Sequence, residues 1–158
     1  MLSQRFKDVL RQVSPRFEEM GLRWSVIGST NMALHGMDVE PSDLDIVTNV
    51  EGAREIREEF HGDVEEEMKR VVSDGDSPDY HEMTLEIQDV EVHVIGGYED
   101  DVYFGKIVEG RTEGLRSGDL EVPCLTLRAE MDAYRSIGRG NKAERIKEYL
   151  IDLNEGCK

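Results

Sequence analysis

The first apolar positions of the chain recur every three or four residues. They are Leu2, Phe6, Val9, Leu10, Val13 and Phe17. Because an α-helix turns once in about 3.6 residues, this spacing places all six on one face and predicts a helix over residues 3–20. Pro15 lacks a backbone N–H group, so we expect the helix to be kinked or split there. Gly21 is expected to end it.

Two short apolar runs, residues 23–27 and 44–48, come next and are typical of buried strands. The small residues at 30–35, between the two runs, predict a helix. A further helix is expected over residues 51–60, where His61-Gly62 closes it. The pattern therefore predicts strand, helix, strand and helix in succession.

The hydrophobic period then changes to two. Apolar and polar residues alternate in Met83–Ile87 and again in Val90–Ile95, with Gln88-Asp89 between them. This alternation predicts an antiparallel hairpin. A strand over residues 68–72 is expected to precede it.

The last third of the chain returns to helical spacing. Residues 98–122 look irregular, with short strands expected at 106–108 and 120–122. Helices are predicted at 126–137 and 141–153, where glycines interrupt the chain between them.

These elements predict an α/β (α+β) fold, with a mixed sheet flanked by helices over residues 1–122 and a helical extension, residues 123–158, packed on it. With 158 residues, 38% hydrophobic and 34% charged, the chain is expected to be globular. No apolar run approaches the roughly 20 residues of a membrane helix, so no membrane partner is expected. Cys124 and Cys157 are far apart, which favours free thiols and a cytoplasmic protein.

The formal net charge of −16 limits the kinds of partner that the chain can bind. An acidic chain repels a phosphate backbone, so binding to extended nucleic acid is not expected. Acidic residues are concentrated between Glu51 and Glu67. This run is interpreted as a solvated helix face and its following strand, with a partner-binding surface as the alternative.

Asp43 and Asp45 stand one residue apart at the start of an apolar run. Residues i and i+2 of a strand point to the same face, so the two carboxylates would project together about 6–7 Å apart. Two like charges at that separation cost energy unless a cation neutralises them. The spacing therefore predicts a divalent metal site.

A glycine turn, Gly28-Ser29, ends the strand before these aspartates and begins a helix. Unpaired N–H groups at a helix N-terminus, here those of Gly28, Ser29 and Thr30, form an anion site. The turn is not a Walker-type phosphate loop, because the spacing Gly-x-x-x-x-Gly-Lys-Ser/Thr is absent. We expect it to bind phosphate close to the predicted metal site.

The second strand of the predicted hairpin has one polar face, formed by Asp89, Glu91 and His93. This face is either a solvent-exposed strand face or a source of Glu91 as a third carboxylate. Two divalent ions about 3.5–4 Å apart need several carboxylate oxygens, which favours the second interpretation. His93 lies on the same face and is placed to hydrogen-bond within the site. A structural zinc site is not expected, because the histidines and cysteines lack ligand spacing.

The string GSTNMALHG…SDLDIV, followed by VEVHVI, resembles the nucleotidyltransferase superfamily. That superfamily includes DNA polymerase β, antibiotic nucleotidyltransferases and the minimal nucleotidyltransferases of toxin–antitoxin loci. The resemblance covers residues 22–97 and extends through the segment at 123–125 to Arg139 and Lys142, which look like the family's basic helical tail. It implies a polymerase β-like core. The chain departs from the pattern at Glu91, where Asp is commoner, and at Val39 and Pro41, where related sequences often carry Arg and Thr.

The resemblance also implies a reaction and its residues. Asp43 and Asp45 would hold two Mg²⁺ ions, with Glu91 as the third ligand, and these three residues form the implied catalytic set. A hydroxyl of a small molecule, a protein or an RNA end would attack a nucleoside triphosphate, and pyrophosphate would leave. The implied nucleotide-binding residues are Gly28, Ser29, Thr30, Arg139 and Lys142. Each of the last two is alternatively a solvated helix end.

A different interpretation stays open at this point. The chain would then be a catalytically degenerate copy of the fold that binds a partner, as an antitoxin-like module does. Glu91 and the absent arginine favour this interpretation, whereas the intact aspartate pair favours an enzyme. A protein partner or a second copy of the chain is compatible with either interpretation.

Overall fold

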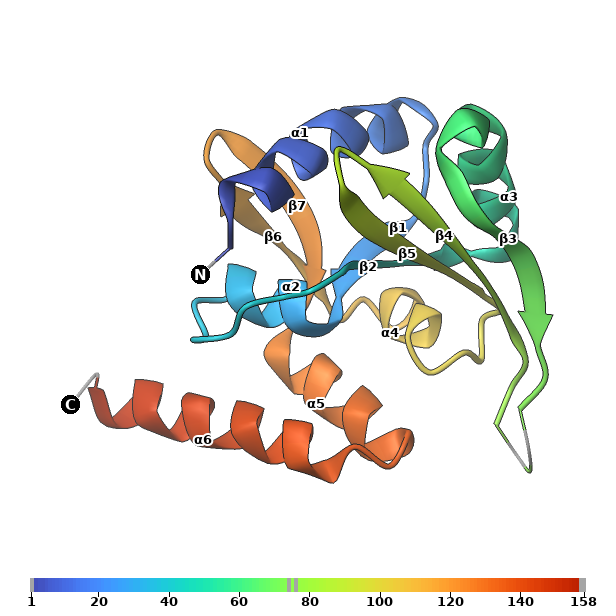
Figure 1. Ribbon diagram of the computed structural model, residues 1–158. Helices are drawn as coiled ribbons and strands as arrows, with labels where there is room; N and C mark the ends of the chain where they lie inside the picture. Colours follow the sequence, from blue (N-terminus) through green and yellow to red (C-terminus); the bar gives the residue numbers. More distant parts are fainter. Residues whose placement is uncertain (1, 74, 76, 157–158) are drawn as a thin grey trace.

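The structure is a computed structural model that describes residues 2–73, 75 and 77–156 (Figure 1). Its centre is a seven-stranded mixed sheet in the order β3-β4-β5-β2-β1-β7-β6. The strands are β1 (Trp24–Ile27), β2 (Leu44–Asn49), β3 (Val64–Val71), β4 (Tyr80–Ile87), β5 (Val90–Gly97), β6 (Thr112–Ser117) and β7 (Leu120–Leu125). The helices are α1 (Gln4–Glu19), α2 (Gly28–Leu34), α3 (Val50–Glu59), α4 (Phe104–Val108), α5 (Leu127–Ser136) and α6 (Gly140–Gly156), with a 3-10 turn at His61–Asp63. The structure thus confirms the α/β class.

The middle of the sheet mixes the two strand directions. β2 runs antiparallel to β1 and parallel to β5, and β1 runs parallel to β7. The predicted hairpin is confirmed, because Ile87 pairs with Val90 across a two-residue turn. Gln88 and Asp89 have φ values of 50° and 64°, the left-handed conformation that such a tight turn requires.

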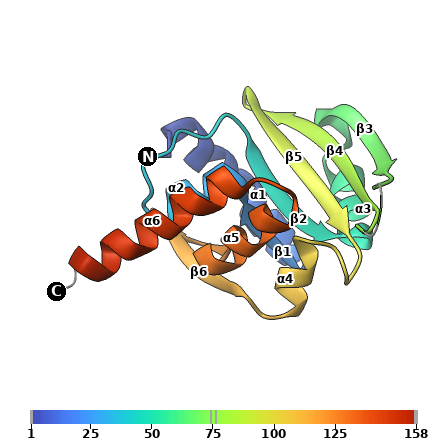
Figure 2. The ribbon, with the colours of Figure 1, turned by 90° about the horizontal axis from the view of Figure 1, so that it is seen from below.

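Helices cover both faces of the sheet. α1 and α3 lie on one face, and α2, α4, α5 and α6 lie on the other (Figures 1 and 2). Alternation along the strands divides their side chains accordingly. Leu44 and Ile46 belong to the main apolar core with α1, whereas Val47 joins a smaller cluster with Phe104 of α4 and Ala129 of α5. Asp45 alternates with Leu44 and Ile46 and therefore lies on the α4–α5 face.

The opening helix is continuous through Pro15 and is not split there. A proline leaves the carbonyl group four residues earlier, that of Arg11, without its usual helical partner. Pro15 and Arg11 are both exposed, so water can reach that carbonyl group. Solvation at this face explains why the helix tolerates the proline.

Three features of residues 98–125 differ from the expectation. The strand expected at residues 106–108 is wrong, because these residues end α4, where Phe104 and Ile107 pack together at helical spacing. The edge strand β6 escaped prediction because Leu115 is its single apolar residue. The predicted boundary after residue 122 falls inside β7, so the division into a core and an extension stays a prediction.

None of the helices in the described part of the chain combines the length and the apolar character that crossing a bilayer requires.

Candidate active site

The two aspartates lie at the start of the central strand β2. Asp43 directly precedes the strand and Asp45 is its second residue. The Asp45 side chain is 28% exposed and faces the same side as Ile27 of β1, its antiparallel partner. Asp43 is half-buried.

Gly28 brings the β1–α2 turn against Asp45. Its φ is +71°, a conformation that favours glycine, and a Cβ atom there would lie 2.7 Å from Asp45 Oδ2. A side chain at position 28 would therefore displace the carboxylate. The turn and the aspartate strand form one unit.

The N–H group of Gly28 is not free for a phosphate. It donates to Oε1 of Glu130, a fully buried residue of α5, at 2.6 Å. Thr30 is also buried, and its hydroxyl donates to the backbone carbonyl of Asp43 at 2.9 Å. Ser29 is half-buried and lines the cavity described below. Of the three turn residues, Ser29 is therefore the one best placed to bind an anion in the cavity.

Parallel pairing of β2 with β5 decides which side chain accompanies each aspartate. Asp45 pairs with His93. Two residues earlier in the same register, Asp43 lies beside Glu91, and the charge of the Asp43 carboxylate raises the pKa of Glu91. Glu91 is exposed and does not line the cavity. The structure therefore places the predicted third carboxylate beside Asp43, at the open edge of the site.

His93 occupies the inner position. Its Nδ1 lies 3.7 Å from Asp45 Oδ1, and its Nε2 lies 3.3 Å from Oε2 of Glu82 on β4. The nearby Asp45 carboxylate raises the pKa of His93; burial opposes this shift, and the charge of Glu82 adds to it. The two carboxylates thus stabilise the charged form of His93 relative to an isolated imidazole.

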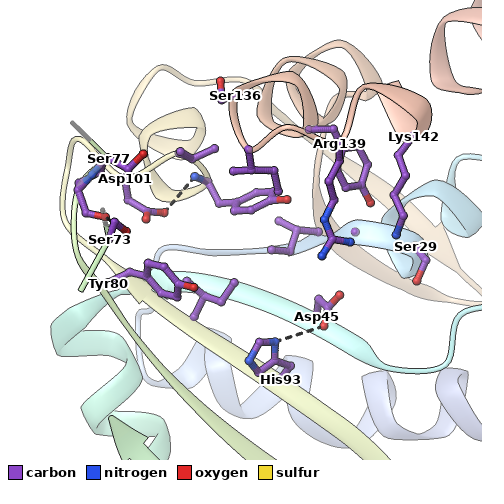
Figure 3. A pocket seen from close by; sticks show the side chains of 18 residues that line it. Ser29, Asp45, Ser73, Ser77, Tyr80, His93, Asp101, Ser136, Arg139 and Lys142 are labelled. Carbon is purple, nitrogen blue, oxygen red and sulfur yellow. Dashed lines mark hydrogen bonds and ion pairs between the residues drawn. The ribbon is translucent and has the colours of Figure 1, made fainter. Parts of the chain in front are cut away.

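A cavity of about 560 Å³ opens above Asp45 and His93 (Figure 3). Ser29, Arg139 and Lys142 line one end of it, and Figure 3 shows the Arg139 side chain directed toward Asp45. The other end is lined by Ser73, Ser77, Tyr80 and Asp101, among others. The cavity, which Asp45 lines and Asp43 does not, therefore has a basic end beside Asp45 and a hydroxyl-rich, acidic end farther away.

The connection between α5 and α6 positions the two basic residues. α5 ends at Ser136 and α6 begins at Gly140, so Arg139 lies in the turn and Lys142 in the first turn of α6. Lys142 Nζ lies 5.6 Å from the centre of the Tyr134 ring, a cation–π distance. Tyr134 itself is buried in α5 and also lines the cavity.

The donor chemistry fits Mg²⁺, although no group of three or more His, Cys, Asp or Glu side chains in the described residues is arranged to hold a metal ion. Mg²⁺ prefers oxygen ligands, keeps several waters and is usually bound by one or two carboxylates together with substrate phosphates. Asp43 and Asp45 supply the carboxylates. Arg139 and Lys142 can share the phosphate charge.

Sequence reasoning missed two contributors to the site. Glu130 falls on the buried stripe of α5 formed by Leu127, Met131 and Tyr134, at spacings of three and four residues. A charged residue on an apolar stripe is a signal that the sequence does contain. Asp101 is also buried and accepts hydrogen bonds from the N–H groups of two residues that follow it, but no periodic pattern marks it.

Comparisons with known proteins bear on the family and the fold. The chain is similar to a solved structure from Thermotoga maritima, named as a candidate nucleotidyltransferase, with 28% identity, a TM-score of 0.76 and 96% of each chain covered. No curated protein matches the chain. A family model for aminoglycoside-2''-adenylyltransferase matches residues 9–150. The chain is therefore a nucleotidyltransferase and belongs to the aminoglycoside-2''-adenylyltransferase family.

Proposed function

We propose that the protein is a Mg²⁺-dependent enzyme that transfers a nucleoside monophosphate from a nucleoside triphosphate to a hydroxyl acceptor and releases pyrophosphate. The observation that carries this proposal is that Asp45 faces Arg139 and Lys142 across one cavity. Carboxylates for a metal and cations for phosphate are the two requirements of this chemistry. The proposal fits a member of a nucleotidyltransferase family.

Asp43 and Asp45 are the residues that would hold Mg²⁺. When bound, the metal neutralises phosphate charge and favours deprotonation of the attacking hydroxyl. Glu91 lies beside Asp43 and would contribute to a second ion only at the exposed edge of the site. Two ions with Glu91 as a ligand remain part of the proposal.

The basic end of the cavity would bind the triphosphate. Arg139 and Lys142 offset charge on the phosphates, and the Ser29 hydroxyl group donates a hydrogen bond to one of them. Because Gly28 already donates to Glu130, its contribution is the close approach of the backbone to Asp45. Catalysis then consists of positioning and charge neutralisation, with little covalent work for the protein.

For the acceptor we propose a cationic, polyhydroxylated small molecule. The family description names an aminoglycoside as the substrate of its members. The hydroxyl-rich end of the cavity, with buried Asp101, suits such a molecule, and a net charge of −16 attracts cations. A protein side chain and an RNA end are the other acceptors to test.

The test is pyrophosphate release with each of the four common nucleoside triphosphates and Mg²⁺. The acceptor panel contains aminoglycosides with and without a free 2''-hydroxyl group, a short RNA and a protein extract. We expect release that requires an acceptor and Mg²⁺ and that disappears in Asp45→Ala. Absence of pyrophosphate with every combination would contradict the proposal and favour a degenerate, partner-binding copy of the fold.

A further inference from the structure

Glu130 is a buried acid that the proposed reaction does not use. It lies in the first turn of α5 and is 0% exposed. Its Oε1 accepts two hydrogen bonds, from the Gly28 N–H at 2.6 Å and from Asn31 Nδ2 at 3.0 Å. Its Oε2 and the Oδ1 of Asn31 are buried and have no hydrogen-bond partner within the described part of the chain.

A carboxyl group at this position is costly. Burial raises the pKa of Glu130 to about 7, although the bonds from Asn31 and Gly28 oppose the shift. The neighbouring positions of the stripe, Leu127 and Met131, are apolar, and an apolar side chain at 130 would avoid the desolvation cost. Packing therefore does not explain the acid, and its two hydrogen bonds indicate what it does.

Those bonds connect the two halves of the site. Gly28 lies against the Asp45 carboxylate, so close that a Cβ atom at position 28 would be 2.7 Å from Asp45 Oδ2. Asn31 also donates to the carbonyl group of Leu125, which ties α2 to the end of β7. Beyond Glu130, α5 continues to the turn that carries Arg139. One carboxyl group thus fixes the aspartate side of the cavity relative to its basic side.

We infer that Glu130 is a positioning residue: its Oε1 holds the Gly28 turn, and with it Asp45 and Ser29, at a fixed place relative to the segment that carries Arg139 and Lys142. This inference rests on the proposed function for its effect on nucleotide binding. The positional effect itself is independent of that function, because it concerns only the hydrogen bond to Gly28 and the contact of Gly28 with Asp45.

Two substitutions separate hydrogen bonding from packing. Glu130→Gln keeps an oxygen that accepts both bonds, whereas Glu130→Met has a similar volume and no acceptor for either. We expect Glu130→Met to weaken binding of Mg²⁺ with a non-hydrolysable nucleoside triphosphate by about 10-fold. We expect Glu130→Gln to stay within about 3-fold of wild type, since its oxygen makes the same bonds.

A matched control distinguishes positioning from stability. Met131→Ala removes a buried side chain next to Glu130 in the sequence, outside the cavity lining, and is expected to lower the melting temperature without changing nucleotide affinity. If Glu130→Met does not fold, Glu130→Asp replaces it, because its shorter side chain draws the carboxyl group away from Gly28. Glu130→Asp is then expected to weaken binding as Glu130→Met would.

Amide NMR of the metal-free protein gives a readout that does not depend on nucleotide. The Gly28, Ser29 and Asp45 signals are expected to move in Glu130→Met and to stay close to wild type in Glu130→Gln. An unchanged Asp45 signal in Glu130→Met, or equal nucleotide affinity in wild type and Glu130→Met, would overturn the inference. If wild type binds no nucleotide, the proposed function fails, and the NMR comparison alone decides the positioning role.

Discussion

Two pairs of facing residues, two positions apart where β2 runs beside β5, each contain one aspartate but lie in different surroundings. Asp43 and Glu91 form the outer rung, where both carboxylates are open to solvent on at least one side. Asp45 and His93 form the inner rung, which is the floor of a cavity covered by α5 and α6. The outer rung opposes two acids, and the inner rung pairs an acid with a base.

The contrast between the two rungs shows that strand spacing alone does not define a site. Both rungs lie on the same face of the sheet, two residues apart. Only the inner one meets Arg139 and Lys142, because the α5–α6 turn extends over Asp45. Partial exclusion of water at this rung strengthens its charge interactions relative to those of the outer rung.

Substitution of the aspartate in each rung is expected to have the strongest effect. Asp45→Ala and Asp43→Ala should each weaken metal binding by roughly 100-fold or more, since each removes a carboxylate ligand. The measurement is binding of Mn²⁺, as a probe for Mg²⁺, followed by water proton relaxation. Circular dichroism should show an unchanged fold in both variants. Unfolding of either variant would mean that the aspartate is structural and that the site is misassigned.

The next largest effect is expected for Arg139, in the α5–α6 turn that covers the inner rung. Arg139→Gln should weaken triphosphate binding by about 10-fold, because it removes a charged donor directed at the phosphates. The matched control is Arg135→Gln, an exposed arginine of α5 that does not line the cavity. Calorimetric affinities of the two variants check this prediction. Equal affinities would show that the basic end does not contact phosphate.

A smaller effect is expected on the pKa of His93, which should respond to the inner aspartate and not to the outer one. Asp45→Ala should lower the pKa of His93, because it removes the main group that raises it, whereas Asp43→Ala should leave it nearly unchanged. The pKa of His93 is raised in the folded protein, so its contribution to stability is complete below the unfolded value of about 6.5 and is lost as pH rises through the folded value. NMR titration of the His93 ring in metal-free protein measures the shift. Equal pKa values in both variants would contradict the pairing.

The smallest effect is expected at Glu91. Because this side chain is exposed and outside the cavity lining, Glu91→Gln should change nucleotide affinity by no more than about 3-fold. Competition binding against the wild-type protein measures it. A loss as large as that of Asp45→Ala would contradict this ranking and would show that nucleotide binding depends on Glu91 as much as on Asp45.

The sequence was sufficient where the signal is local. The aspartate spacing, the Gly28-Ser29 turn and the valine alternation of β5 each follow from a short period, and the structure has the corresponding strands and helix. Which of Glu91 and His93 lies inside the cavity could not be predicted from the sequence, because it depends on the register of β5 against β2 and on which rung α5 and α6 cover. Those are contacts between segments distant in the sequence.

Glu130 shows a different limit. Its place on the apolar stripe of α5 is visible in the sequence, but its partners Gly28 and Asn31 are about a hundred residues away. The same separation in sequence explains why the prediction that the Gly28 N–H group is free to bind an anion was wrong. A free N–H at a turn can be inferred locally, whereas the buried acid that occupies it cannot.

The most direct test of the account is calorimetric titration of ATP, GTP, CTP and UTP, each with and without Mg²⁺, into wild type and Asp45→Ala. We predict binding of at least one triphosphate that requires both Mg²⁺ and Asp45. Binding that is independent of Asp45, or no binding of any triphosphate, would contradict it.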